Sequence, residues 1–207
     1  MISVVRILPA DLEGLAIAAE TVARGGLVSY PTETVYGLGC DPFNSNAIRA
    51  AMSAKGKRID KPFPVLVETV DAARQIAEFS DEALKLAARF WPGPLTLILI
   101  AKPKTNSVLA PHGTIGVRSP NHAICLRLLA MCSGLLVGTS ANKTGHRPAT
   151  TAMEVAEELG DELDLILDGG KTTLGVSSTV VDLTKGLRVI REGPISRDEM
   201  LSCLRTA

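Results

Sequence analysis

The alternation of apolar and polar residues predicts short strands separated by helices along the whole chain. Runs of β-branched and aliphatic residues are typical of strands, and apolar positions three or four residues apart are typical of helices. The predicted strands cover residues 3–8, 27–30, 64–68, 95–101, 115–118, 135–138, 165–168, 179–183 and 188–191. The predicted helices begin near residues 11, 44, 71, 81, 121, 151 and 196, and Thr151 with Glu154 and Ser196 with Glu199 fit capping boxes.

The order of these elements predicts an α/β fold with a mixed sheet. Strands that alternate with helices favour parallel pairing, whereas the closely spaced strands near the end of the sequence favour antiparallel pairing. The run at residues 95–101 is continuously apolar, which is typical of a strand buried on both faces. No repeat, low-complexity tract or linker interrupts the pattern, so residues 1–207 are interpreted as a single domain.

Composition excludes several classes of protein. Hydrophobic residues make up 46% of the chain but aromatic residues only 3%, so the core is expected to be aliphatic. The 22 basic and 22 acidic residues balance, which predicts no global attraction to nucleic acid or to an anionic membrane. The four cysteines form no CxxC pair, and the first residues lack the pattern of a signal peptide. We therefore expect a cytoplasmic protein with reduced thiols and no membrane partner.

Four polar segments lie next to predicted strands, where α/β proteins usually bind ligands. Residues 31–39 (PTETVYGLG) leave the second strand, and residues 55–62 (KGKRIDKP) carry four cations. Residues 138–145 (GTSANKTG) and 175–179 (GVSST) carry groups that can hold phosphate or carboxylate oxygens. Each segment also has a plain interpretation, as a strand end, a solvated loop or an ordinary turn.

The residue inventory favours charge stabilisation over covalent catalysis. The sequence contains no P-loop, no HExxH, no paired Cys/His spacing and no GxSxG motif, and nothing convincing as a GxGxxG motif. Its three histidines, His112, His122 and His146, are isolated from one another. Hydroxyls, amides and cations without an evident general base suit the stabilisation of negative charge at a phosphate.

Together these segments resemble the YrdC/TsaC family, the threonylcarbamoyl-AMP synthases. The matching motifs follow in family order: PTETVYGL at 31–38, the cationic loop ending in KP at 55–62, WPGPLT at 91–96, GVR at 116–118, SAN at 140–142, GVSSTVVD at 175–182 and REGP at 191–194. The resemblance extends from about residue 12 to residue 205. Each motif is weak alone, but seven in one order are specific.

The resemblance implies a twisted, mixed parallel/antiparallel sheet with flanking helices around a cationic cavity. It implies that L-threonine, bicarbonate and ATP react to give threonylcarbamoyl-AMP and pyrophosphate, with Mg²⁺ bound through ATP. A downstream transferase would then pass the group to an adenosine in tRNA, which allows some contact with RNA. No residue is assigned to a metal, and Glu33 and Asp182 are only candidates.

The family motifs also assign residues to roles. Lys55 and Lys57 are the expected catalytic cations. The expected threonine-binding residues are Thr32, Arg118 and Ser178. The expected ATP-binding residues are Lys57, Arg58, Lys61, Thr114, Ser140, Asn142 and Arg191. A closing loop over the ligand is expected at residues 55–62.

Two positions depart from the family pattern. Lys57 stands where an arginine is usual, so it supplies charge without a bidentate fork. Leu66 stands where a histidine that contacts threonine is often found. Two alternatives remain open: an RNA-binding module that uses the same cations, and a paralogue of the same fold with a different ligand.

Overall fold

The predicted strands pair into two mixed sheets. The computed structural model describes residues 5–56 and 62–205. Within these residues a five-stranded sheet contains, in spatial order, β1 (Arg6–Pro9), β9 (Leu165–Asp168), β2 (Val28–Tyr30), β3 (Gly37–Gly39) and β8 (Thr139–Ser140). A six-stranded sheet contains β11 (Arg188–Arg191), β10 (Thr179–Asp182), β5 (Leu95–Ile100), β6 (Thr114–Arg118), β4 (Val65–Val67) and β7 (Leu135–Val137). The prediction of a mixed α/β fold is confirmed, but the strands are divided between two sheets.

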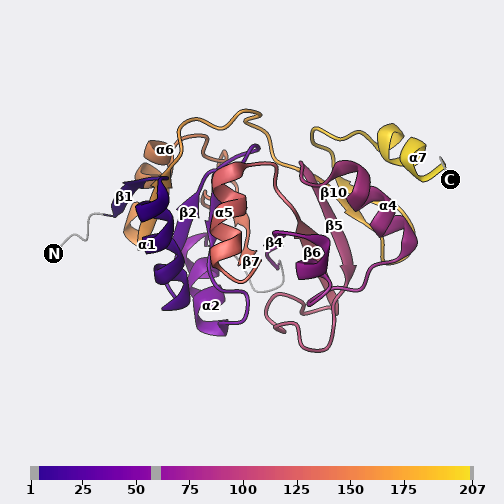
Figure 1. Ribbon diagram of the computed structural model, residues 1–207, viewed down its shortest axis with the longest axis horizontal. Coiled ribbons are helices and arrows are strands. Elements are labelled where there is room, and N and C mark those ends of the chain that lie inside the picture. Colours follow the sequence, from indigo (N-terminus) through magenta and orange to yellow (C-terminus); the bar gives the residue numbers. More distant parts are fainter. Residues whose placement is uncertain (1–4, 57–61, 206–207) are drawn as a thin grey trace.

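Both sheets combine parallel and antiparallel pairs. In the first sheet β9 is parallel to β1 and β2, whereas β3 is antiparallel to β2 and β8. In the second sheet β5 is parallel to β10 but antiparallel to β6, and β4 is parallel to β6. β1 and β2 lie in one half of the molecule and β5 and β10 in the other, with β4 and β7 between them (Figure 1).

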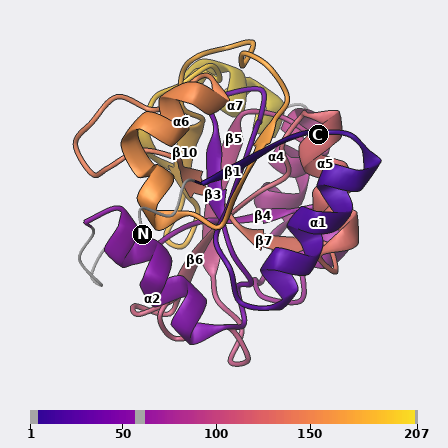
Figure 2. The same ribbon diagram turned by 90° about the vertical axis from the view of Figure 1, so that its left-hand side faces the viewer.

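Helices cover the strands on several sides, as the end-on view shows (Figure 2). α1 and α5 pack against each other beside the first sheet, and α4 packs against α7 beside the second. The helices are α1 (Leu12–Ala23), α2 (Ser45–Ala54), α3 (Val70–Ala73), α4 (Asp81–Phe90), α5 (Ala123–Met131), α6 (Ala152–Leu159) and α7 (Arg197–Arg205), with a 3-10 turn at Gly160–Glu162. The helix predicted to begin near residue 71 is a single turn, because residues 74–76 form turns that lead into a bridge between Ala77 and Ala101.

Side chains that accept hydrogen bonds from backbone N–H groups begin several of these helices. The Asp11 carboxylate accepts a bond of 2.9 Å from the Gly14 N–H at the start of α1. The box at α7 is complete, because the Glu199 carboxylate accepts from the Ser196 N–H while the Ser196 hydroxyl accepts from the Glu199 N–H. At α6 the Glu154 carboxylate reaches one residue further back than the box requires, to the Thr150 N–H. The side chains of these cap residues thus satisfy backbone N–H groups that a helix leaves without a partner at its start.

The junction of the two sheets depends on Tyr30, a fully buried residue at the end of β2. Its hydroxyl donates a hydrogen bond of 2.9 Å to the Val137 carbonyl of β7, in the other sheet. Its ring covers Gly37 and Gly39, where an added Cβ would lie 2.8 and 2.6 Å from ring atoms. The two glycines of the PTETVYGLG segment are therefore required for this close packing.

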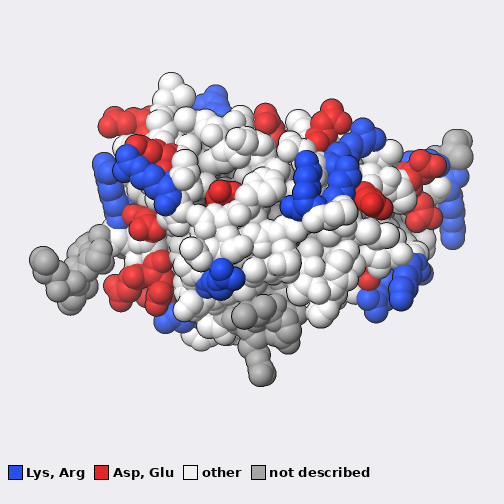
Figure 3. Space-filling view, turned by 90° about the horizontal axis from the view of Figure 1, so that it is seen from below, with Lys and Arg blue, Asp and Glu red and all other residues white. Residues whose placement is uncertain are grey.

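The surface matches the balanced composition. On the face seen from below, Lys and Arg side chains are interspersed with Asp and Glu, and no wide area carries one sign (Figure 3). Within residues 5–56 and 62–205, no helix has the length and apolar character needed to cross a membrane.

Candidate active site

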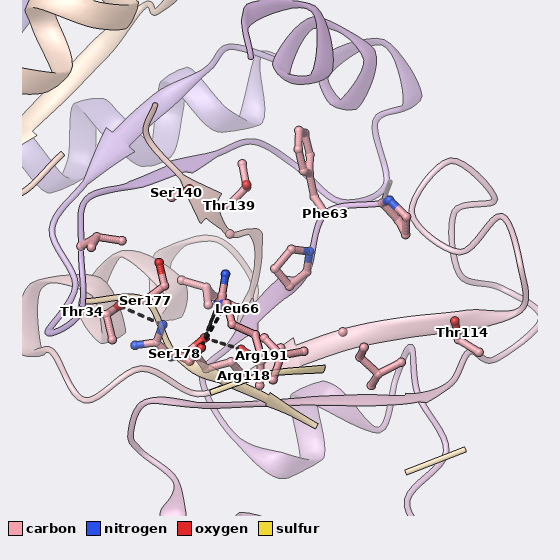
Figure 4. Close-up of a pocket in the computed structure, with 18 residues that line it drawn as sticks. Thr34, Phe63, Leu66, Thr114, Arg118, Thr139, Ser140, Ser177, Ser178 and Arg191 are labelled. Carbon is pink, nitrogen blue, oxygen red and sulfur yellow. Dashed lines mark hydrogen bonds between the residues drawn. The ribbon is translucent and has the colours of Figure 1, made fainter. Parts of the chain in front are cut away.

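A cavity of about 320 Å³ lies between the face of the second sheet and the strand ends of the first (Figure 4). The second sheet contributes Leu66, Thr96, Ile98, Thr114, Gly116, Arg118, Val180 and Arg191. The opposite side is formed by Thr34, Val35, Gly138, Thr139 and Ser140. Residues at 62–64 and at 177–178 complete the lining. Four of the polar segments found in the sequence thus contribute to one cavity.

Arg118 ends β6 and is held by three residues from two parts of the chain. Its Nε donates to the Gly93 carbonyl at 3.0 Å, its Nη1 donates to the Thr34 hydroxyl at 3.0 Å, and its Nη2 lies 2.7 Å from a Glu33 carboxylate oxygen. The residue is only 6% exposed, yet it lines the cavity. This places a fixed guanidinium where a ligand carboxylate or phosphate could bind.

Arg191 ends β11 and is oriented by the backbone of Ser178. Its Nε and Nη2 both donate to the Ser178 carbonyl, at 3.0 and 2.9 Å. The Ser178 hydroxyl also lies 2.9 Å from the Thr96 hydroxyl of β5. Partial burial, and then the neighbouring charge of Arg118, lower the pKa of Arg191 below its usual value. Two guanidinium groups thus line the cavity, which favours an anionic ligand.

The turn after β2 places Thr34, rather than Thr32, in the lining. The Thr32 hydroxyl donates to the Val35 carbonyl at 2.7 Å and accepts from the Thr34 N–H at 3.2 Å, so it closes the turn from behind. The Thr34 hydroxyl lies 2.8 Å from that of Thr32 and accepts from Arg118. This is the local pattern of a Ser/Thr turn, which the TxT spacing could have indicated.

Lys55 lies behind the cavity and holds the SAN segment in place. Its Nζ donates to the backbone carbonyls of Ser140 and Asn142, and the side chain is 4% exposed. The Asn142 amide in turn donates to the carbonyls of Lys143 and His146. Ser140 lines the cavity, whereas Lys55 and Asn142 do not. In the described part of the chain Lys55 thus supports the site through its neighbours.

The other expected site residues divide into two groups. Arg118, Ser178, Thr114, Ser140 and Arg191 line the same cavity. Lys57, Arg58 and Lys61 lie outside the described residues, as does most of the expected closing loop, and their roles stay predictions.

Sequence reasoning missed several lining residues, of which Thr96 is the clearest. Thr96 and Ile98 belong to the run at 95–101, which was interpreted as buried on both faces. One face of β5 is indeed core, but the alternate face carries Thr96 and Ile98 into the cavity. Thr139 and Ser177 were part of recognised segments without being singled out.

Neither candidate metal ligand is available in the cavity. Glu33 is paired with Arg118, and the Asp182 carboxylate accepts from Thr184 and Arg188. Among the residues that the structure describes, no group of three or more His, Cys, Asp or Glu side chains could hold a metal ion. The described donors of the cavity are hydroxyls and guanidinium groups, which do not form a cage for Mg²⁺.

The fold and cavity together define a class: an α/β protein with a cavity that hydroxyls and two arginines line, a setting that suits an anionic ligand. The model of the Sua5/YciO/YrdC family, whose description is "Telomere recombination", matches residues 20–193. The chain therefore belongs to the Sua5/YciO/YrdC family.

Curated relatives from several organisms share most of this chain. A protein of Pyrococcus abyssi named threonylcarbamoyl-AMP synthase is 39% identical over 189 residues, which cover 90% of this chain and 56% of the relative. A protein of Marinobacter nauticus with the same name is 34% identical, over 83% of this chain and 92% of the relative. The chain thus spans little more than half the length of the first relative and nearly all of the second.

Solved structures agree with the family assignment. The crystal structure of P. abyssi Sua5 complexed with L-threonine is 35% identical, with a TM-score of 0.91 over 98% of this chain and 61% of that chain. The crystal structure of E. coli YciO has a TM-score of 0.84 at 25% identity, over 94% of this chain and 98% of that chain. The similarity covers both sheets described above.

Proposed function

We propose that this chain synthesises threonylcarbamoyl-AMP from L-threonine, bicarbonate and ATP. The observation that carries the proposal is the cavity itself: two arginines and several hydroxyls line it, in a chain 39% identical to a relative named threonylcarbamoyl-AMP synthase. The related structure that holds L-threonine supports the same substrate. As the reaction transfers AMP from ATP, the enzyme would be a nucleotidyltransferase.

The proposed chemistry needs charge stabilisation more than a nucleophile from the protein. The threonine amine adds to bicarbonate with loss of water, and a carbamate oxygen then displaces pyrophosphate from the α-phosphorus. Arg118 lines the cavity and its Nη1 keeps one N–H beyond the bond to Thr34, so it is positioned to receive the substrate carboxylate. Arg191, oriented by Ser178, would stabilise negative charge on the phosphates.

The apolar part of the cavity lining suits an intermediate that water would hydrolyse. Carbamates and acyl-phosphate anhydrides are readily hydrolysed, so a synthase benefits from excluding water. Apolar side chains of Leu66, Ile98, Val180 and Phe63 line the cavity among the polar ones. Lys57, Arg58 and Lys61 are proposed to close over the triphosphate from the loop at 55–62.

The remaining roles follow from the same proposal. Mg²⁺, when bound, would neutralise phosphate charge, and we expect it to arrive with ATP because the described residues offer it no cage. A tRNA-modifying transferase would take up the product in the cytoplasm, and contact with RNA stays a prediction. No described feature favours an RNA-binding module over an enzyme.

The proposal is tested by mass spectrometry of a mixture of protein, ATP, Mg²⁺, bicarbonate and L-threonine. We expect threonylcarbamoyl-AMP and pyrophosphate, and neither product when threonine is omitted. Pyrophosphate release that does not depend on threonine would contradict the proposal and favour the paralogue with a different ligand.

A further inference from the structure

Glu33, in the turn after β2, is a buried carboxylate with no place in the chemistry above. Its side chain is 9% exposed, and one oxygen lies 2.7 Å from Nη2 of Arg118, whose side chain is 7% exposed. Neither carboxylate oxygen has a hydrogen-bond partner among the described residues apart from this ion pair. Burial of a carboxylate is unfavourable unless a partner compensates its charge, so this pair calls for an explanation.

The geometry around Arg118 gives Glu33 a specific place. Arg118 lines the cavity, whereas Glu33 does not and instead borders a shallower depression with Arg89 and Asn121. The guanidinium therefore lies between the carboxylate behind it and the cavity in front. With Gly93 bound at Nε and Thr34 at Nη1, Glu33 lies against the third nitrogen as an ion-pair partner, without a hydrogen bond of good geometry. All three nitrogens therefore have a neighbour that restrains the guanidinium, and Nη1 keeps one N–H beyond its bond to Thr34.

The balance of charge depends on the same residue. Arg118 and Arg191 share one cavity and are close enough for the charge of one to affect the pKa of the other. With Glu33 paired to Arg118, the three groups carry a net charge of about +1 rather than about +2. A buried guanidinium without a partner would tend to turn away or to bind water, and it would then adopt more than one orientation.

The backbone of Glu33 connects the turn to a second part of the site. Its carbonyl accepts from the Leu174 N–H at 2.9 Å and from the Thr173 hydroxyl at 3.1 Å. Those residues belong to the segment between β9 and β10, which continues to Ser177 and Ser178 in the lining. Glu33 thus contacts Arg118 through its side chain and the serine segment through its backbone.

We propose that Glu33 is a positioning residue that holds the Arg118 guanidinium in the orientation that receives the carboxylate of the amino-acid substrate. Glu33 acts through Arg118 and does not touch the substrate itself. The proposal rests on the proposed function for the identity of the substrate, but the positioning of Arg118 does not depend on it.

The first test compares Glu33→Gln with the parent protein in steady-state pyrophosphate release. Glutamine keeps the size of the side chain and an oxygen that can accept from Arg118, but it removes the charge. We expect the KM for L-threonine to rise roughly 10-fold, with the KM for ATP and kcat changed by less than about 3-fold. The matched control Glu82→Gln, at an exposed position in the first turn of α4, should change none of these values.

A merely structural role for Glu33 gives a different result. Equal increases in both KM values, or a fall in kcat alone, would overturn the proposal. In an Arg118→Lys background, adding Glu33→Gln should raise the threonine KM by less than about 2-fold, because the group that Glu33 orients is gone. A full 10-fold effect in that background would also overturn it.

A second readout does not need the reaction. The Arg118 Nε–H resonance in ¹⁵N NMR reports whether the guanidinium is held, and it should move or broaden in Glu33→Gln but not in Glu82→Gln. If the parent protein makes no threonine-dependent product, the proposed function fails while this signal still tests the positioning. An Arg118 resonance unchanged by Glu33→Gln would overturn the proposal.

Discussion

At the scale of single residues, the two arginines of the cavity are held in different ways. Arg118 is buried and paired with a carboxylate, whereas Arg191 is partly exposed and, among the described residues, is held by the Ser178 carbonyl and hydroxyl. A buried guanidinium with a partner suits a small carboxylate, and an arginine at the rim suits a larger phosphate. The two residues should therefore respond differently to substitution by lysine.

Arg191→Lys tests the two hydrogen bonds from the Arg191 guanidinium to the Ser178 carbonyl. Lysine keeps the charge but cannot donate two parallel bonds to one carbonyl, so the orientation of the cation is lost. We expect the KM for ATP to rise roughly 10-fold, or about 1.4 kcal/mol, with little change in stability. Arg188→Lys is the matched control, on the same strand but paired with Asp182. An Arg191→Lys enzyme with an unchanged KM for ATP would contradict this role.

Lys55→Met tests whether the buried lysine supports the fold of the site. Methionine has a similar length but leaves the Ser140 and Asn142 carbonyls without their donor. We expect the free energy of unfolding, measured with urea, to fall by about 2–3 kcal/mol. The same substitution at exposed Lys85 should change it by less than about 0.5 kcal/mol. A stable but inactive Lys55→Met protein would instead favour direct catalysis by this lysine.

At the scale of elements, strand ends bring distant polar segments together. Both the existence of the strands and the clustering of chemistry at their ends could be predicted from apolar patterning. β3 and β8 could not, because the glycines of GLG disfavour strands and the two residues of β8 are too few to give a periodic signal; Tyr30 packs over these glycines where β3 pairs. The sequence also could not decide between Thr32 and Thr34 as the residue that lines the cavity, because this depends on the geometry of the turn.

Gly138 and Leu66 show how closely neighbouring elements are fitted at the cavity. An added Cβ at Gly138 would lie 2.2 Å from Leu66 Cγ, well inside contact distance. We expect Gly138→Ala to destabilise the protein by about 2 kcal/mol in chemical unfolding. Because the two side chains compete for one space, Leu66→Ala should recover part of that loss in the double variant. Strictly additive effects would show that the strain is released elsewhere.

β10 provides a pH-dependent contribution through Asp182. Partial burial opposes ionisation, but hydrogen bonds from Thr184 and the ion pair with Arg188 outweigh it and lower the pKa of Asp182. A carboxyl whose pKa is lowered on folding stabilises the folded state when the pH is above the pKa of the unfolded state. This contribution is lost as the pH falls through the pKa of the folded state. Asp182→Asn should cost about 1 kcal/mol at neutral pH, and the difference should shrink progressively as the pH falls below about 4. A difference that is independent of pH would contradict this account.

At the scale of the whole molecule, the division of the strands between two sheets is the main feature that the pattern of apolar and polar residues did not predict. Strand order depends on contacts between residues far apart, such as Tyr30 with Val137, which no local signal encodes. Two arginines lie in the cavity, whereas Lys and Arg are interspersed with Asp and Glu across the surface in view (Figure 3). The interpretation of residues 1–207 as one domain stays a prediction.

The most direct test of the central claim follows the carbon of bicarbonate into the product. The protein is mixed with ATP, Mg²⁺, L-threonine and ¹³C-bicarbonate. The nucleotide products are then separated, and their masses are measured by mass spectrometry. The account predicts threonylcarbamoyl-AMP that carries the label, formed together with pyrophosphate. AMP and pyrophosphate without a labelled threonyl adduct, or no consumption of ATP at all, would contradict it.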